Sequence, residues 1–580
     1  MNLLNKYWKI GATLLFGVVV FLHWWLVSPM LLAYQEQYQL FLMDGDYLCQ
    51  RLMIPDGFAC CLGEYLTQFY INHALGAFVL AIIYVITQRL VWLLMKAVSP
   101  QASLHYPLSF LPVLTLWLLQ GDENVLLTFP VAIILSLSTM YLYEKAGKYQ
   151  IYFAIIAIPL LYWLAGPVVL MFVAWIVLRQ WQTATTKWKG LCIGIFFVIY
   201  ILVCILVDSW ILPYPLFRLF YGVDYYRFIE VYYWMFFIAM LLCVLTPLSV
   251  HWMPNSKKRI WLAGACEAGV LLVLFLLLRP SFYDARKYEV IEYDYLVRCQ
   301  RWDEIISKAD QKTPDLPMTV CATNLALGMK GQLGERLFDF YQNGMQGLLP
   351  SFERNFSTIM LTGEVYWQLG LINSAQRFAF EAMEALPNYA KSCRAVKRLA
   401  ETNLVNGEYA VARKYLQMLG KTLSYSQWAR RTMPLLGNEK AINEHPIYGR
   451  MRQLRLQEDF LFSEQELDKI FGQLMMQNQQ NGLALQYLLA APLLDRDVNK
   501  FMNYMVYVDG LHLGYRPRSC QEAIAFAYAQ RNQRPPQGYV NEIVMRNFSD
   551  FRQIYSQGGQ NAPQLGRFRN TAWYYLIGAK

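Results

Sequence analysis

Apolar residues dominate the first half of the chain and fall into nine segments separated by short polar stretches. A helix needs about 20 apolar residues to cross a bilayer, and several of these segments are shorter. Two pairs of segments are interrupted, one by Gly121-Asp122-Glu123-Asn124 and the other by Ala165-Gly166-Pro167. Each pair predicts either two short helices or a re-entrant hairpin, which is tolerated where protein or a wet cavity surrounds it. The segments are 10–32, 71–95, 107–119, 125–143, 150–164, 167–179, 190–208, 231–250 and 260–279.

After residue 280 the pattern changes to periodic apolar positions with frequent charges, which predicts amphipathic helices and few strands. Similar stretches recur and align on Gln300, Gly331, Gly370 and Gly407, in steps of 31, 39 and 37 residues. The residue pattern of each unit predicts a short turn followed by an amphipathic helix. The pattern resembles the tetratricopeptide repeat, which has a period of about 34 residues and two helices per unit. The resemblance implies a helical solenoid with a concave face for a partner.

The fold expected is therefore all-α, with about nine spans in a transmembrane domain at 1–280 and a soluble helical-repeat domain at 281–580. The aromatic, basic tail "GRFRNTAWYYLIGAK" is expected either to pack on the solenoid or to rest near a membrane surface. Polar outer loops are expected at 33–70, 120–124 and 209–230.

Composition and charge support a membrane protein and set its orientation. Hydrophobic residues make up 56% of the chain and charged residues only 16%, against roughly 25% in soluble domains. Lysines and arginines favour one set of loops by roughly four to one, which predicts a cytoplasmic N-terminus. The net charge of +10 is explained by this bias, so no nucleic-acid partner is expected. We expect a multi-pass inner-membrane protein whose first segment stays as an anchor and whose C-terminal domain is periplasmic.

The first outer loop concentrates acids, and these are the first candidates for chemistry. A carboxylate held against apolar surface has a raised pKa and can act as a general base, whereas a solvated loop acid has no such role. Tyr34, Tyr38 and Phe41 accompany the first acid at helical spacing, which predicts an amphipathic helix on the outer leaflet. The five acids of the loop are Glu36, Asp44, Asp46, Asp56 and Glu64.

Three further sites carry polar side chains beside or within apolar segments. Asp122 and Glu123 form either a divalent-cation site with oxygen ligands or a hydrated turn. Arg218 and Arg227 lie in the aromatic loop at 209–230 and either hold a lipid-linked phosphate in a bidentate fork or anchor the interface. Glu267 lies inside a predicted span, where an acid usually faces a cavity or a partner.

The order of spans, long first loop and C-terminal helical domain resembles the GT-C superfamily of membrane glycosyltransferases. The resemblance implies a polyprenyl-phosphate-linked sugar donor and a first-loop acid that acts as base or metal ligand. By position that acid is Glu36, with Asp44 or Asp46 as rivals, and Gln37 stands where many members have a second acid. Asp122 or Glu123 matches the second-loop acid, which implies a divalent metal ion. Arg218 or Arg227 matches the contact to the lipid phosphate.

The stretch "IPDGFACCLGEYLTQFYINHALGAFVLAI" also resembles a family of polytopic membrane proteins from Bacteroides-type bacteria. Three functions stay open at this point. The first is transfer of a sugar from a lipid donor to a periplasmic acceptor recruited by the helical domain. The second is a non-catalytic membrane-anchored scaffold for an envelope protein complex, because helical repeats mostly bind proteins. The third is transport, which is based on Glu267 and the interrupted helices.

Overall fold

The structure, a computed structural model, describes residues 2–99, 105–184, 186–228, 233–252, 260–350, 356–388, 390–458, 466–560 and 562–578. Within these ranges the protein is all-α, with no strand and one isolated antiparallel bridge between Val125 and Tyr226. The chain forms two compact units. Unit 1 comprises Met1–Ala285, Leu386–Arg394 and Gln417–Ala429, and unit 2 comprises Arg286–Ala385, Ala395–Leu416 and Arg430–Lys580.

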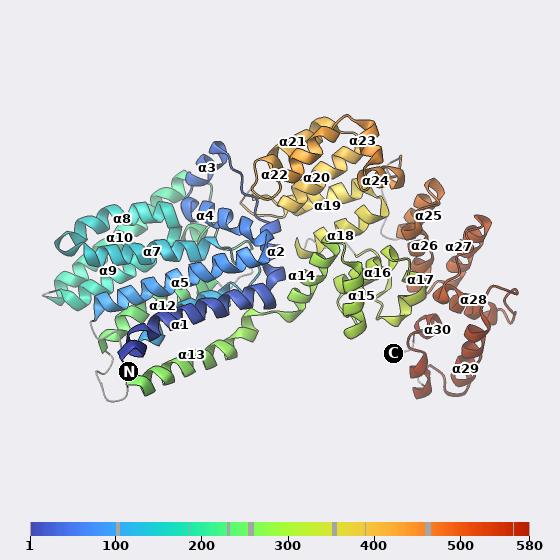
Figure 1. The fold of residues 1–580 in the computed structure, drawn as a ribbon, viewed down its shortest axis with the longest axis horizontal. Coiled ribbons are helices and arrows are strands. Elements are labelled where there is room, and N and C mark those ends of the chain that lie inside the picture. Colours follow the sequence, from blue (N-terminus) through green and yellow to red (C-terminus); the bar gives the residue numbers. More distant parts are fainter. Residues whose placement is uncertain are drawn as a thin grey trace. The chain divides into compact units, whose positions relative to one another are not determined.

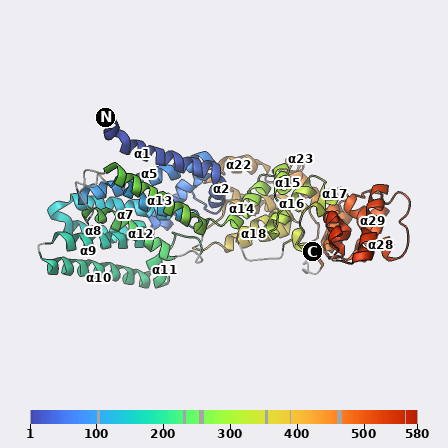
Figure 2. The same cartoon turned by 90° about the horizontal axis from the view of Figure 1, so that it is seen from below.

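Unit 1 contains the apolar helices (Figure 1). Helix α5 is the longest of them and packs against α1 and α7, between which Figure 1 shows it. Helices α8, α9 and α10 contact one another and lie side by side in both ribbon views (Figure 2). The helices are α1 (Asn2–Leu22), α2 (Pro29–Gln37), α3 (Gly45–Leu52), α4 (Gly57–Thr67), α5 (His73–Val98), α6 (Leu111–Leu119), α7 (Thr128–Lys145), α8 (Gln150–Ala165), α9 (Val169–Thr183), α10 (Lys187–Ile211), α11 (Leu216–Tyr221), α12 (Tyr233–Ser249) and α13 (Ile260–Phe282).

Six helical stretches among the described residues are long and apolar enough to cross a membrane, where the sequence pattern suggested about nine spans. The segment at 107–119 belongs to a shorter apolar helix, Tyr106–Leu119. The segments at 150–164 and 167–179 are α8 and α9, which both pack against α7 and are joined at Gly166, where φ is +66°. The six stretches are Tyr7–Val27, His73–Val98, Gly147–Thr183, Lys187–Ile211, Trp234–Trp252 and Gly264–Phe282.

Two segments from the second half of the sequence complete unit 1. The extended stretch after α2 bonds to both: the Leu40 N–H donates to the Lys391 carbonyl at 3.0 Å, and the Met43 N–H donates to the Lys421 carbonyl at 2.7 Å. The Ser392 hydroxyl donates to the Gln37 carbonyl at 2.8 Å. All residues from Leu31 to Gln37 are buried, so α2 differs from the surface helix that the spacing of its aromatic residues suggests. Local amphipathicity could not reveal this, because distant segments provide the cover.

Unit 2 is built from pairs of consecutive helices that pack together, such as α15 with α16, α18 with α19 and α25 with α26. Helices α20, α21 and α22 belong partly to each unit. The helices are α14 (Ala285–Arg298), α15 (Trp302–Gln311), α16 (Pro317–Met329), α17 (Leu333–Arg336), α18 (Phe356–Leu369), α19 (Ile372–Glu384), α20 (Cys393–Asn406), α21 (Tyr409–Gly420), α22 (Ser426–Thr432), α23 (Glu439–Glu444), α24 (Tyr448–Leu454), α25 (Leu467–Gln477), α26 (Gly482–Leu494), α27 (Val498–Gly510), α28 (Arg518–Gln530), α29 (Glu542–Gly558) and α30 (Ala572–Leu576).

The four residues on which the recurring stretches align share one backbone geometry. Gln300, Gly331, Gly370 and Gly407 all have φ between +55° and +92°. After each, the next N–H bonds to the carbonyl five residues earlier, at 2.7–2.9 Å. This is the Schellman ending, in which a left-handed residue satisfies the last carbonyls of a helix. The repeat detected in the sequence is therefore a repeat of helix ends.

Gly407→Ala is expected to destabilise unit 2 by about 1–2 kcal/mol, because an L side chain is disfavoured in the left-handed region. A Cβ at Gly407 would meet no atom within 4 Å, so the cost comes from the backbone alone. Urea unfolding of the purified protein in detergent measures it. Gly510→Ala is the control, since Gly510 is helical and equally open. Equal losses in the two variants would contradict the argument.

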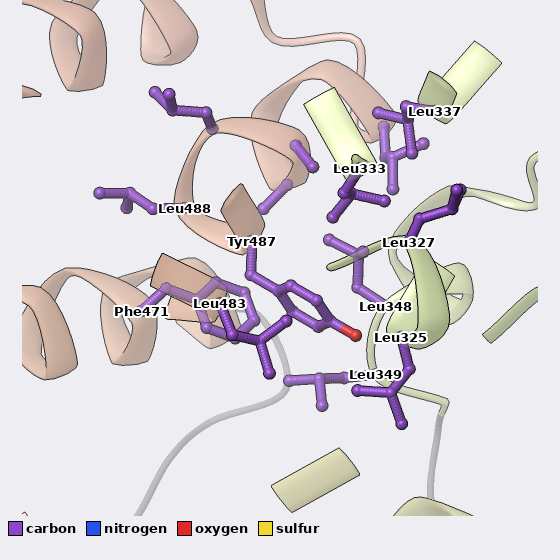
Figure 3. Close-up of a cluster of buried hydrophobic side chains, with 14 of the residues drawn as sticks. Leu325, Leu327, Leu333, Leu337, Leu348, Leu349, Phe471, Leu483, Tyr487 and Leu488 are labelled. Carbon is purple, nitrogen blue, oxygen red and sulfur yellow. The ribbon is translucent and has the colours of Figure 1, made fainter. Parts of the chain in front are cut away.

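The core of unit 2 surrounds Tyr487 of α26 (Figure 3). The Tyr487 ring meets Phe471 of α25 edge to face, with ring centroids 5.4 Å apart. Leucines from α16, α17, α26 and the turns at 337–339 and 348–349 surround it, and all are buried. Burying an apolar side chain of this size contributes about 1.5–3 kcal/mol. This cluster therefore holds the helix pairs together. Its labelled leucines are Leu325, Leu327, Leu333, Leu337, Leu348, Leu349, Leu483 and Leu488.

The aromatic tail packs within unit 2. Trp573 is 1% exposed and contacts Phe548, Phe551 and Phe568. The tail is also tied to α28, because one Glu522 oxygen accepts the Ala572 N–H at 2.6 Å and the other accepts Arg518 Nε at 3.0 Å. Burial raises the pKa of Glu522 to about 7, although both hydrogen bonds oppose the shift.

The attachment of the tail is expected to weaken as pH rises from about 4.5 to about 7. Unfolded Glu522 loses its proton near its ordinary pKa, whereas the folded state holds it up to about pH 7. The folded state then binds more protons, and stability falls with rising pH by at most about 3 kcal/mol. Hydrogen exchange of residues 563–578, corrected for intrinsic rates, measures how the stability of this attachment changes with pH. Glu522→Gln should remove the dependence, and an unchanged pH profile in that variant would contradict the assignment.

Candidate functional site

Unit 1 contains a buried polar pocket formed by the first loop, the loop at 209–230 and the segment 386–394. It encloses about 20 Å³, which is room for one or two water molecules. Helix α4 reaches it because Gly63 lets that helix approach α7, where a Cβ would lie 2.7 Å from the Thr128 nitrogen. The lining residues are Tyr38, Gln39, Arg51, Cys60, Glu64, Leu126, Thr128, Asp224, Tyr226, Arg227, Pro387, Asn388 and Ala390.

One wall of the pocket is an ion pair between α3 and α4. Arg51 Nη2 lies 2.7 Å from Glu64 Oε1, and the Tyr47 hydroxyl donates to the other Glu64 oxygen at 2.5 Å. Burial raises the pKa of Glu64, while the charge of Arg51 opposes that shift. Burial also acts to lower the pKa of Arg51, but the charge of Glu64 outweighs it and the pKa is raised. Each charge therefore opposes the effect of burial on the pKa of the other group.

Asp56 lies behind this wall, at the start of α4, in the left-handed region with φ +67°. Its carboxylate is fully buried, and Oδ2 accepts the N–H groups of Val223 and Asp224 at 3.2 and 3.3 Å. Oδ1 has no hydrogen-bond partner among the described residues. Burial, and then the charge of Asp224, raise the pKa of Asp56 well above its usual value. Asp56 therefore favours its protonated form.

Asp224 and Arg218 meet at Asn388. The Asn388 amide donates to Asp224 Oδ1 at 3.0 Å and to the Val223 carbonyl at 2.8 Å, and its oxygen accepts from Arg218 Nη2 at 3.2 Å. Arg218 also lies over the Tyr226 ring. Asp224 is 6% exposed, and its Oδ2 accepts no hydrogen bond from the described residues. One oxygen of this buried carboxyl group thus lacks a hydrogen-bond donor from the described residues.

Arg227 is a buried cation in an aromatic setting. It is 3% exposed, and its guanidinium carbon lies 5.2 Å from the Tyr38 ring and 5.7 Å from the Tyr34 ring. Burial lowers the pKa of Arg227, while Tyr34, Tyr38 and the charge of Glu123 oppose the shift. The Arg227 backbone is held by its N–H, which donates to the Asn124 carbonyl at 2.7 Å. A desolvated cation of this kind favours an anionic ligand.

The other acids singled out in the sequence lie apart from this lining. Glu36 is fully buried and accepts from the Tyr425 hydroxyl at 3.4 Å. Asp44 pairs with Lys421 at 2.6 Å, and Asp46 is exposed in the first turn of α3. Asp122 accepts the Asn124 N–H at 2.8 Å, and Glu123 accepts from the Asn124 amide at 3.4 Å. Asp122 and Glu123 therefore lie in the turn whose Asn124 carbonyl accepts the Arg227 N–H.

Glu267 of α13 has a partner, as expected for an acid inside an apolar helix. Its Oε1 lies 2.6 Å from His105 Nδ1. His105 precedes the short helix Tyr106–Leu119, and nothing in its sequence neighbourhood marks it as a contact of α13. Within the described ranges, no group of three or more His, Cys, Asp or Glu side chains could hold a metal ion.

Sequence reasoning found both loops of the pocket but chose Glu36, with Asp44 or Asp46 as rivals, and none of these three acids is in the lining. Asp56 and Glu64 are two of five acids in one loop, and Asp224 is one acid among many tyrosines. Asp56 and Asp224 are held by residues more than 100 positions away, namely Val223 and Asp224 for Asp56 and Asn388 for Asp224. The "PDG" turn before α4 is the one local signal at Asp56, because Asp tolerates the left-handed conformation.

The fold and the pocket define a class: over its described residues the protein is all-α, with six helical stretches of membrane-spanning length and composition and a buried, charged pocket. The chain belongs to the family of unknown function DUF6057, which matches residues 6–579. No curated protein and no solved structure matches the chain.

Proposed function

We propose that this protein is an integral membrane glycosyltransferase that moves a sugar from a polyprenyl-phosphate donor to an acceptor. The observation that carries the proposal is the pocket itself, whose lining includes both a buried carboxyl group, Asp224, and a buried arginine, Arg227. A lipid-phosphate donor needs a cationic group for its phosphate, and an acceptor hydroxyl needs a base. Both kinds of group occur in this one pocket.

Arg227 and Arg218 are the proposed phosphate ligands. Arginine forms two parallel hydrogen bonds to a phosphate, and such charge-assisted bonds are roughly twice as strong as neutral ones. The burial of Arg227 increases this preference, because its charge has little water around it. The phosphate would also balance the charge that burial disfavours.

Asp224 is the proposed general base. Two neighbouring carboxyl groups in a buried site do not both ionise readily, because burial and mutual repulsion both disfavour two charges. The pKa of Asp56 is raised by burial and by Asp224, which makes Asp56 the proton holder. Asp224, which lines the pocket, is then the proposed proton acceptor. Asp122 and Glu123 are the proposed ligands of a divalent metal ion.

The proposal includes the orientation expected from the lysine and arginine distribution. The N-terminus lies in the cytoplasm, the protein is in the inner membrane, and the pocket and unit 2 face the periplasm. A reporter fused at residue 400 should then be active only in the periplasm. Unit 2, as a tetratricopeptide-like array, would bind the acceptor.

A second candidate function is a non-catalytic scaffold. It is favoured by the shared Schellman endings at Gln300, Gly331, Gly370 and Gly407, because stacked helical repeats mainly bind other proteins. In that case the pocket charges would only stabilise unit 1.

Membranes of a strain that lacks the protein test the glycosyltransferase proposal. Lipid-linked sugars and envelope glycans are compared by mass spectrometry with those of the complemented strain. We expect the unspent lipid donor to accumulate and one glycan to disappear, with both restored by the full-length protein. Identical lipid-linked sugars and glycans in the two strains would contradict the proposal.

A further inference from the structure

The pocket is closed by a short stretch that lies far from it in the sequence. Pro387, Asn388 and Ala390 all line it, and we call these three residues the Asn388 plug. They belong to unit 1 by their contacts, although the preceding helix α19 belongs to unit 2. Asn388 has φ +57°, a left-handed conformation that asparagine tolerates better than most residues.

The side chain of Asn388 forms hydrogen bonds with Arg218 and Asp224, the groups that are proposed to bind the ligand. Its oxygen accepts from Arg218, as a phosphate oxygen would, and its amide donates to Asp224 Oδ1, as an acceptor hydroxyl would. The remaining space is about 20 Å³, which is room for one or two water molecules. The second Asp224 oxygen is buried and accepts no hydrogen bond from the described residues.

We infer that the Asn388 plug is an autoinhibitory contact that closes the pocket and leaves it when a phosphate-bearing ligand binds. A phosphate oxygen makes a charge-assisted bond to Arg218 and replaces the neutral amide oxygen, so the exchange favours the ligand. Plug closure then lowers the apparent affinity by the fraction of molecules that are closed. This inference rests on the proposed function for the identity of the ligand, but the closure itself can be measured without it.

Cys60 reports whether the pocket is open. Its side chain lines the pocket and is 2% exposed, and burial raises the pKa of its thiol. The full-length protein in detergent is treated with a small methanethiosulfonate at pH 8.5, and the modified peptides are quantified by mass spectrometry. Cys321, buried in unit 2, serves as the internal reference for global unfolding.

Asn388→Gly removes the side chain and keeps the left-handed backbone. We expect labelling of Cys60 to rise about tenfold, the change that corresponds to the loss of one to two net hydrogen bonds. Labelling of Cys321 should not change. Asn532→Gly is the matched control, because Asn532 has φ +53° and is exposed in unit 2. It should label as the unaltered protein does.

Inorganic pyrophosphate is the binding probe. In Asn388→Gly it should bind about tenfold more tightly by isothermal titration and should slow the labelling of Cys60. Equal Cys60 labelling in Asn388→Gly and the unaltered protein would overturn the plug. Faster labelling with no pyrophosphate binding would support the plug and count against the phosphate role in the proposed function.

Discussion

Asp224→Asn is expected to lower sugar transfer by about 10²–10⁴-fold, the usual contribution of a positioned general base. Asparagine keeps the size of the side chain and can still bond Asn388, but it cannot take a proton from an acceptor hydroxyl. The variant is expressed in the strain that lacks the protein, and glycans and lipid-linked sugars are measured as for the deletion. We expect the glycan to stay absent and the donor to stay high.

Two further variants serve as a control and a comparison for Asp224→Asn. Asp303→Asn is the control, because Asp303 lies in unit 2 with 81% of its side chain exposed, and it should restore the glycan fully. Asp56→Asn should retain much more transfer than Asp224→Asn, since an amide resembles the protonated carboxyl that Asp56 favours. If Asp224→Asn restored the glycan completely, Asp224 would not be the general base. That result would favour the scaffold function over the glycosyltransferase function.

Arg51→Met is expected to destabilise unit 1 by about 3–5 kcal/mol, the cost of leaving a buried charge without its partner. Glu64 has only 7% of its side chain exposed and relies on Arg51 for its charge. Methionine fills similar space but provides no cation. Thermal unfolding in detergent, monitored through the buried cysteines of unit 1, measures the loss.

A double variant separates the charge from the packing. Arg51→Met with Glu64→Leu removes both charges, and replacing a buried pair by apolar side chains is often neutral. The Tyr47 hydroxyl still has the Leu40 carbonyl at 2.9 Å as a partner. Arg286→Met is the exposed control, because 76% of that side chain is accessible and it should change stability by less than about 1 kcal/mol. A double variant as unstable as Arg51→Met would contradict the argument.

Local features of the fold were accessible from the sequence, whereas the pocket was not. The helical class follows from periodicity, and the alignment on Gly331, Gly370 and Gly407 found the helix ends, because a left-handed residue leaves a local signature. The two arginines were found from their aromatic loop. The closure by Asn388 could not be found, since Arg218 and Asn388 are 170 residues apart. Helix α2 likewise looks like a surface helix until distant segments are known to cover it.

The passage of the chain back into unit 1 sets an order for its biogenesis. The Leu40 and Met43 N–H groups find their carbonyls only on Lys391 and Lys421. Both lysines lie more than 100 residues after the end of α13 in the sequence, so the ribosome makes them well after that helix. Unit 1 therefore completes its hydrogen bonding only when most of the protein has been synthesised, and a chain truncated at residue 285 would lack the partners of Leu40 and Met43.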